Sequence, residues 1–219
     1  MAEPAAKMST ATLEWIRPPQ QARSQRTLER LLDAAEELIE DRGIEGMTIA
    51  AIVRQAGSSV GAFYARFGDK ETLIRCVFER FYEQAQATAE AALDPSRWHH
   101  ASVRDAIAAT VLFATNVFSE RRGVIAALSS QQAADLRAPA EVLSALIADK
   151  LLSLAESRGE RPTHRDPSAA TRTCVWLVLS ALSSWAQAGA DENSPPGAAE
   201  NFATDVADMS IGFLFGARS

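Results

Sequence analysis

The sequence contains few of the residues that build metal sites and disulfide bonds. Its 219 residues include two cysteines and three histidines. Cys76 and Cys174 lie far apart in separate predicted helices, which favours reduced, partly buried thiols over a disulfide framework and leaves a redox role open. His99 and His100 are adjacent and His164 is distant, so no two of them have the spacing of metal ligands on a helix. We therefore expect no metal site.

The sequence also lacks the motifs of membrane proteins, secreted proteins and common enzymes. No apolar run is long enough to span a membrane, and residues 1–22 are interrupted by prolines and lack the apolar segment of a signal peptide. We find no glycine-rich phosphate loop, no Gly-x-Ser-x-Gly motif and no neighbouring nucleophile and base. We therefore expect a cytoplasmic protein that is not an enzyme, needs no cofactor and has no membrane partner.

Apolar residues recur at helical spacing along the chain, and no segment shows the alternation that predicts a strand. The first predicted helix runs from about Ser24 to Arg42 and ends at Gly43. Later glycines and prolines end or begin further helices. The sequence therefore predicts an all-α fold of about nine helices, in which the helix from Lys70 to about Leu93 is long enough to connect two domains.

Residues 43–73 predict two short helices joined by a tight turn. Thr48 is a good N-cap for the first helix, whose apolar residues recur at intervals of three and four. Gly57 permits the left-handed conformation that ends this helix, and Ser58 or Ser59 can cap the second. Two helices joined by such a turn are typical of proteins that read DNA.

The second short helix has a packing side and an outward side. Phe63 and Phe67, four residues apart, can pack on the first helix. This leaves Val60, Ala62 and Arg66 facing outward. Val60 and Ala62 can touch thymine methyl groups but cannot make paired hydrogen bonds to a base, so direct readout should be sparse. For Arg66 we weigh two partners, a phosphate and a guanine.

The net charge of −6 is unfavourable for binding DNA, but the charges are unevenly placed along the chain. Arginines gather in the N-terminal arm, at the start of the first helix and in the helix pair. Four acidic residues, Glu36, Glu37, Glu40 and Asp41, fall at the far end of the first helix. We expect them to face away from a duplex, because phosphates respond to the local basic patch rather than to the net charge.

From Arg23 to about Phe81 the sequence resembles the DNA-binding domain of the TetR family of transcriptional regulators. The spaced order of Gly, Thr, Ala-Gly, Tyr, Phe and Lys in this stretch carries the resemblance. The resemblance implies an all-helical homodimer that binds a palindromic operator in double-stranded DNA and releases it when a small molecule enters the second domain. The chain departs from the family pattern at Arg66, where His is frequent, and at Gly68, where Pro is frequent.

The candidate DNA contacts are hydroxyl groups, basic side chains and the outward residues of the helix pair. They are Arg23, Arg26, Thr48, Ala50, Ser58, Ser59, Val60, Gly61, Ala62, Tyr64, Arg66 and Lys70. Tyr64 matches the family's DNA-facing tyrosine. Lys70 begins a helix capped by Asp69, so its ammonium and the helix amides can receive a phosphate together. Arg23 and Arg26 are either a basic arm for phosphates and the minor groove or a solvated helix start.

The second domain's role as a sensor is implied mainly by the resemblance, because its apolar residues could equally be plain core. The candidate ligand contacts combine apolar side chains with a few polar anchors, the usual character of a small-molecule site. They are Phe113, Asn116, Val117, Leu128, Leu146, Arg172, Trp176 and Ser180. Asn116 and Arg172 are the candidate polar anchors.

The last two predicted helices carry more apolar surface than one core needs, so we expect them to form a four-helix dimer interface. The candidate interface residues are Val178, Leu182, Trp185, Phe202, Val206, Met209 and Phe213.

We therefore expect a flexible arm over residues 1–22, a helix-turn-helix DNA-binding domain over 23–69 and an effector-binding and dimerisation domain over 70–219. The leading hypothesis is a transcriptional repressor released from its operator by a small, mostly apolar ligand. The alternative is a constitutive or architectural DNA-binding protein whose C-terminal domain serves only for dimerisation. A third hypothesis, a helical enzyme, would need convergent titratable groups in a cleft.

Overall fold

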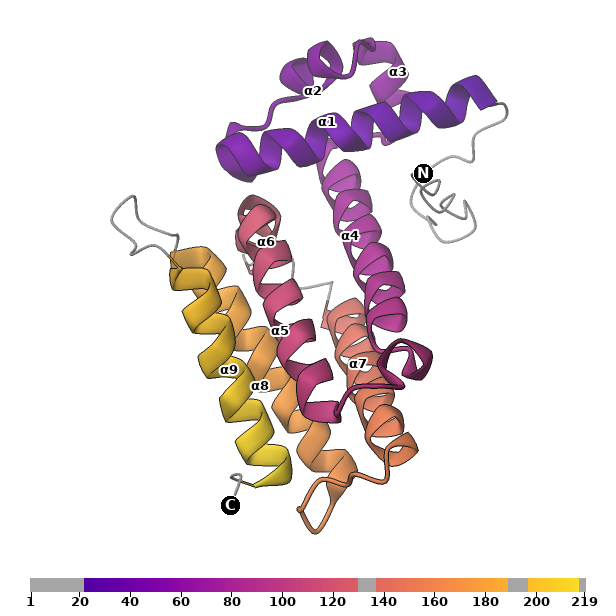
Figure 1. Ribbon diagram of the computed structural model, residues 1–219. Helices are drawn as coiled ribbons and strands as arrows, with labels where there is room; N and C mark the ends of the chain where they lie inside the picture. The colour runs from indigo at the N-terminus through magenta and orange to yellow at the C-terminus, as the bar shows by residue number, and fades with distance from the viewer. Residues whose placement is uncertain (1–21, 130–136, 189–196, 217–219) are drawn as a thin grey trace. The chain divides into compact units, whose positions relative to one another are not determined.

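The computed structural model describes residues 22–129, 137–188 and 197–216, and these residues form α-helices, one short 3₁₀ helix and connecting turns (Figure 1). The all-α fold with nine α-helices is confirmed for this part of the chain. The chain divides into two compact units between Arg80 and Phe81. The expected N-terminal arm lies outside the described residues except for Ala22.

The first unit contains α1 (Ala22–Gly46), α2 (Ile49–Gln55), α3 (Val60–Tyr64) and the beginning of α4 (Lys70–Ala92). The predicted apolar stripe of α1 is completely buried or nearly so, and α2 and α3 lie on one side of α1 (Figure 1). Buried residues of all four helices form this core: Leu28, Leu31, Leu32, Ala35, Leu38, Ile39, Ile52, Phe63, Leu73 and Val77.

Gly43 interrupts α1 where the sequence predicts its end. Its φ of 68° and ψ of 174° are not helical, and one further turn follows before Gly46. A left-handed φ strains a residue with a Cβ, so glycine suits this position.

Glu36 differs from its acidic neighbours on α1. It is 7% exposed, because an arginine of α4 holds it inside the unit.

The second unit contains the rest of α4, the 3₁₀ helix η1 (Pro95–Trp98) and five further helices. These are α5 (Val103–Glu120), α6 (Arg122–Leu128), α7 (Arg137–Ser157), α8 (Pro167–Ala188) and α9 (Ala198–Phe215). Within this unit α5 packs along α9, and α8 packs against both α7 and α9 (Figure 1). No helix in the described ranges is long and apolar enough to cross a membrane.

Two α-helices of the second unit, α5 and α8, begin at side-chain caps. Ser102 and Asp105 form a reciprocal capping box at α5, and Asp166 accepts the N–H of Ala169 at 2.9 Å at α8. The 3₁₀ helix η1 is also capped, because the Asp94 carboxylate accepts the N–H of Ser96 at 2.8 Å. Each cap satisfies a backbone N–H that has no partner within its helix.

Candidate functional site

Side-chain hydrogen bonds cap the beginnings of α2 and α3. Thr48 Oγ1 accepts the N–H of Ala51 at 3.2 Å, and Ser59 Oγ accepts the N–H of Ala62 at 3.1 Å. Between them Gly57 has a φ of 55°. The predicted caps are therefore confirmed, and of the two serines considered it is Ser59 that caps α3.

The short helix α3 has one buried side and one exposed side. Phe63 is fully buried and its ring lies 5.5 Å from that of Phe67, as the four-residue spacing predicts. Val60 and Tyr64 are 49% and 51% exposed. Among the other candidates, Thr48, Ala50, Ser59 and Gly61 are exposed and Ser58 and Ala62 are half-buried. Most of the candidate DNA contacts therefore lie at least partly exposed within residues 48–64, and we call the exposed side of this helix pair the reading face.

Lys70 has structural partners that the sequence did not predict. Its ammonium Nζ donates to the carbonyl of Ile44 at 3.0 Å and to that of Met47 at 3.1 Å. These carbonyls lie beyond the break at Gly43, so Lys70 ties the end of α1 to the beginning of α4. An ammonium has three N–H bonds, and two of them are used here, so one remains for a phosphate.

Asp69 caps α4 as predicted, because its carboxylate accepts the N–H of Thr72 at 2.7 Å. Hydrogen bonds from Thr72, first from its side chain and then from its backbone, lower the pKa of Asp69. The charged carboxylate also favours the positive end of the helix dipole.

Arg66 is bonded to the protein rather than left open toward a duplex. Its Nη2 donates to the carbonyl of Ser24 at 3.1 Å and to the Ser24 hydroxyl. Burial lowers the pKa of Arg66, which stays charged. This contact ties α3 to the start of α1. Arg26 lies exposed on that same part of α1, whereas the side chain of Arg23 lies outside the described residues.

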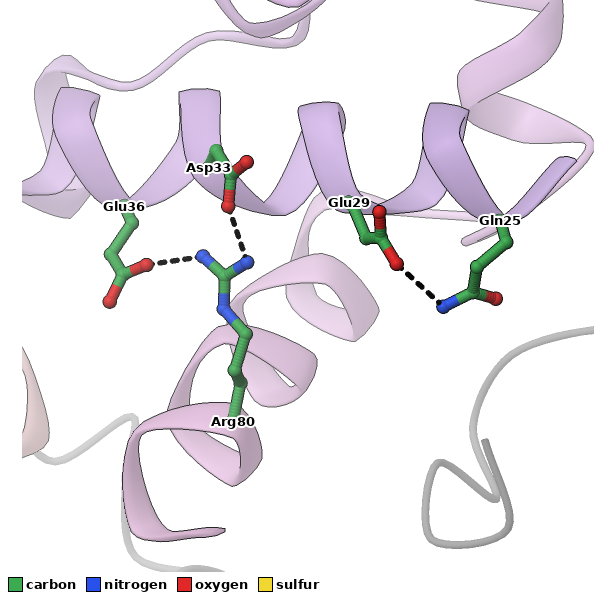
Figure 2. A network of polar contacts seen from close by, with 5 residues as sticks. All are labelled: Gln25, Glu29, Asp33, Glu36 and Arg80. Carbon is green, nitrogen blue, oxygen red and sulfur yellow. Dashed lines mark hydrogen bonds and ion pairs between the residues drawn. The ribbon is translucent and has the colours of Figure 1, made fainter. Parts of the chain in front are cut away.

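A buried ion-pair network joins α1 to α4 (Figure 2). Arg80 Nη1 lies 2.6 Å from Asp33 Oδ1, and Nη2 donates to Glu36. Arg80 is 5% exposed, while the side chain of Asp33 is 60% exposed, so the pair with Glu36 is the buried one. Figure 2 also shows Gln25 donating to Glu29 at 3.2 Å on the same helix, a contact within α1 alone.

The second unit contains a pocket of about 290 Å³, here called the outer pocket. Three phenylalanine rings and several aliphatic side chains line it, together with one arginine, one glutamate and three neutral polar groups. The aromatic and polar members are Phe81, Phe113, Phe118, Gln84, Thr88, Thr110, Glu120 and Arg121. The volume is near the low end of the range for small-molecule sites, and the lining has their usual mixture of apolar walls and few polar groups.

Two of the candidate ligand contacts, Phe113 and Val117, line the outer pocket. The others lie elsewhere. Asn116, Arg172 and Trp176 are exposed, and Leu128, Leu146 and Ser180 are half-buried outside this lining. Arg172 donates to Ser168 at 2.7 Å within its own helix.

The contribution of α4 to the pocket was not predicted, because the length of this helix indicates a connector between two domains. Phe81, Gln84 and Thr88 recur at three and four residues, a spacing that puts them on one face of α4. That repeat is the signal that could have identified this wall.

The candidate dimer residues fall into a buried set and an exposed set. Leu182 is fully buried and Val206 is 6% exposed, and Val206 belongs to the core of its own subunit. The rings of Trp185 and Phe202 stack at 5.2 Å, and Val178 packs against the core. Met209 and Phe213 are 48% and 38% exposed on α9, and on the adjacent α8 Trp176 and Leu177 are also exposed.

Both cysteines are buried thiols. Burial raises the pKa of Cys76 to about 12, and the nearby Glu79 carboxylate adds to this effect. Burial also raises the pKa of Cys174. Among the described residues no group of three or more His, Cys, Asp or Glu side chains is placed to hold a metal ion.

Residues 31–77 match the family described as "Bacterial regulatory proteins, tetR family". The HTH-type transcriptional repressor BepR of Brucella suis biovar 1 is 27% identical over 175 residues, which cover 75% of this chain and 82% of that protein.

Two solved structures share the fold. A protein of Mesorhizobium loti assigned to the TetR-family transcriptional regulators superposes with a TM-score of 0.70 at 20% identity, covering 88% of this chain and 98% of that one. FadR of Bacillus subtilis, solved with stearoyl-CoA, superposes with a TM-score of 0.62 at 16% identity, covering 87% and 99%.

Proposed function

We propose that this chain, which is a TetR-family transcriptional regulator, acts in the cytoplasm as a homodimeric repressor that a small, mostly apolar ligand releases from its operator. The observation that carries the DNA-binding part is the reading face. There Thr48 caps α2 and Ser59 caps α3. Val60 and Tyr64 of α3 are exposed to solvent, and Phe63 of the same helix is fully buried. We assign residues 23–69 to DNA binding and residues 70–219 to effector binding and dimerisation.

The chemistry of the reading face favours contacts to phosphates and thymine methyl groups. Val60 and Ala62 offer methyl groups, and the Tyr64 hydroxyl can donate to a phosphate. Arg66 is already bonded to Ser24, so its guanidinium is not placed for a paired contact to guanine. We expect it to contribute positive charge near the duplex instead. Specificity therefore depends on the shape of the DNA and on half-site spacing more than on many base contacts.

Tyr64→Phe tests the reading face directly. The loss of one hydrogen bond to a phosphate should weaken operator binding by about fivefold per reading unit, since such a bond contributes about 1 kcal/mol. Tyr82→Phe is the matched control, because Tyr82 is half-buried in the second unit. Fluorescence anisotropy with DNA fragments that the protein retains measures both. Equal affinities for the two variants would remove Tyr64 from the interface.

The outer pocket supports a ligand-responsive regulator over a constitutive one. Its lining has one cationic side chain, Arg121, and one anionic side chain, Glu120. The stearoyl-CoA bound by the Bacillus FadR carries several phosphate charges, which one arginine beside a glutamate would not neutralise. We therefore propose that the effector of this chain is a small neutral molecule.

Filling the pocket tests this part of the proposal. Ala114 lines the outer pocket, and Ala114→Trp should block the binding of N-phenyl-1-naphthylamine, a neutral aromatic dye. Ala108→Trp is the control, because Ala108 is exposed on the same helix outside the lining. Dye fluorescence with the full-length protein reports binding. If both variants bind the dye as the parent protein does, the outer pocket is not the ligand site and the constitutive alternative gains support.

The exposed apolar side chains of α8 and α9 support the homodimer. Trp176, Leu177, Met209 and Phe213 are 62%, 39%, 48% and 38% exposed on two helices that pack side by side. Large apolar residues gathered on neighbouring helices are typical of a protein–protein interface. A second copy of the same helices would cover them by twofold symmetry.

A further inference from the structure

A second cavity, of about 80 Å³, adjoins the outer pocket in the second unit, and we call it the inner cavity. Five residues line both spaces and form what we call the neck: Leu93, Thr110, Ala114, Ile147 and Leu179. The rest of the inner cavity is lined almost entirely by aliphatic side chains of α5, α7, α8 and α9. The side chains of the neck therefore lie between the two spaces, and one of these side chains is the small methyl group of Ala114.

Thr110 differs from the other helical threonines near it. Thr115 donates to the carbonyl of Val111 at 2.9 Å, and Thr171 donates to that of Pro167 at 2.8 Å. Such a bond to the carbonyl four residues earlier is the usual way to satisfy a buried helical hydroxyl. Thr110 Oγ1 is buried but makes no hydrogen bond to any residue in the described ranges. A buried hydroxyl without a partner is unfavourable, so the neck holds a donor that a ligand can satisfy.

We propose that the effector is a neutral molecule with an aromatic ring in the outer pocket, a hydrogen-bond acceptor at Thr110 and an aliphatic tail in the inner cavity. This inference rests on the proposed function, in which the outer pocket holds the effector. The rings of Phe81, Phe113 and Phe118 suit the aromatic part by edge and face contacts. The apolar wall of the inner cavity suits the tail, and its small volume limits the tail to a few carbons.

Alkyl phenyl ketones have this arrangement of ring, carbonyl acceptor and tail, and they serve as probes. Acetophenone, butyrophenone, hexanophenone and octanophenone are titrated against the full-length protein loaded with N-phenyl-1-naphthylamine. Each methylene that enters the inner cavity should tighten binding by about fourfold, and the gain should stop once the cavity is filled. Affinity that does not change with tail length would overturn the tail assignment.

The neck is tested with Thr110→Val, which removes the hydroxyl and keeps the shape. The variant should bind the ketones about tenfold more weakly than the parent chain and should bind alkylbenzenes of equal tail length unchanged. Thr115→Val is the control and should change neither series, because Thr115 lies on the same helix, bonds the Val111 carbonyl and lines neither space. Equal losses for ketones and alkylbenzenes would refute a hydrogen bond at Thr110.

The inner cavity is tested with Ser210→Leu, which fills it. Ser210 donates to the carbonyl of Val206 at 2.7 Å within its own helix and also hydrogen-bonds the Cys174 thiol on α8, so Ser210→Ala controls for the loss of both bonds. The gain with tail length should vanish in Ser210→Leu and persist in Ser210→Ala. Thermal melting followed by circular dichroism verifies that both variants fold. If the affinity for the ketones still rises with tail length in Ser210→Leu, the tail does not lie in the inner cavity.

These results are separable from the proposed function. Ketones that bind with the expected dependence on tail length but never release retained DNA would support the ligand class and contradict the regulatory role. Dye that binds and is displaced by no ketone would overturn the ligand class and leave the outer pocket as the effector site.

Discussion

Arg80 offers a test of how α4 is held to α1. Replacing it with methionine keeps the apolar stem and removes the guanidinium, so the buried Glu36 loses its ion pair with Arg80. Both residues are less than 10% exposed. Breaking a buried ion pair from one side costs about 3 to 5 kcal/mol, because a carboxylate stays in a poorly hydrated site. We expect Arg80→Met to lower the free energy of unfolding of the first unit by about that amount.

Two further variants separate the buried pair from the exposed one. Asp33→Ala should cost at most about 1 kcal/mol, since the Asp33 side chain is 60% exposed and water screens its charge. The double variant Arg80→Met with Glu36→Leu should recover most of the stability lost in Arg80→Met, because no buried charge is left without its partner.

The assay is urea unfolding of each variant followed by circular dichroism at the helix band. A loss below about 1 kcal/mol in Arg80→Met would refute the buried-pair argument. The argument would also be refuted if the double variant were no more stable than Arg80→Met alone. The stability lost in Arg80→Met would then come from lost packing rather than from the carboxylate that the guanidinium no longer pairs with.

Four further outcomes follow from the structure. Lys70→Met should lower the free energy of unfolding by about 2 kcal/mol, because two hydrogen bonds to carbonyls are lost. It should also reduce the magnitude of the log–log salt slope of DNA binding by about 0.9, and an unchanged slope would show that Lys70 does not contact a phosphate. Cys76 should resist iodoacetamide at neutral pH until urea unfolds the protein, because the pKa of its buried thiol is raised to about 12; rapid labelling of folded protein would contradict this. Met209→Asp should give folded monomers in sedimentation, whereas Val206→Asp should unfold its subunit, and folded dimers of Met209→Asp would exclude this face. Because the pKa of Asp69 is lowered in the folded chain, its carboxylate stabilises the folded state at pH values above the unfolded carboxyl's pKa of about 4. This contribution is lost as the pH falls through the lower folded pKa, so the stability of Asp69→Ala should depend less on pH in the acid range.

The sequence predicted features that depend on neighbouring residues. Thr48 and Ser59 cap their helices because each bonds an N–H three residues later, and Gly57 turns the chain by its own backbone freedom. Phe63 and Phe67 pack because they lie four apart on one helix. Local chemistry determines these contacts, so a single sequence is enough to predict them.

The sequence did not predict the contacts between distant residues. The partners of Lys70, Arg66 and Arg80 lie at separations of 26, 42 and 44 residues. A surface basic residue and a buried one look alike in sequence, and only the packing of α1 on α4 decides which it becomes. Only Phe113 and Val117 of the candidate ligand contacts line the outer pocket for the same reason, since its wall on α4 faces α5 only in the folded unit.

The central claim is that the reading face binds DNA as one half of a symmetric pair. Selection of bound fragments from a random double-stranded pool tests it most directly. The account predicts enrichment of inverted repeats whose half-sites lie about 34 to 36 Å apart, or a multiple of that helical turn, and loss of binding when half a turn is inserted between them. A selected pool without inverted repeats, or binding that survives the half-turn insertion, would contradict it.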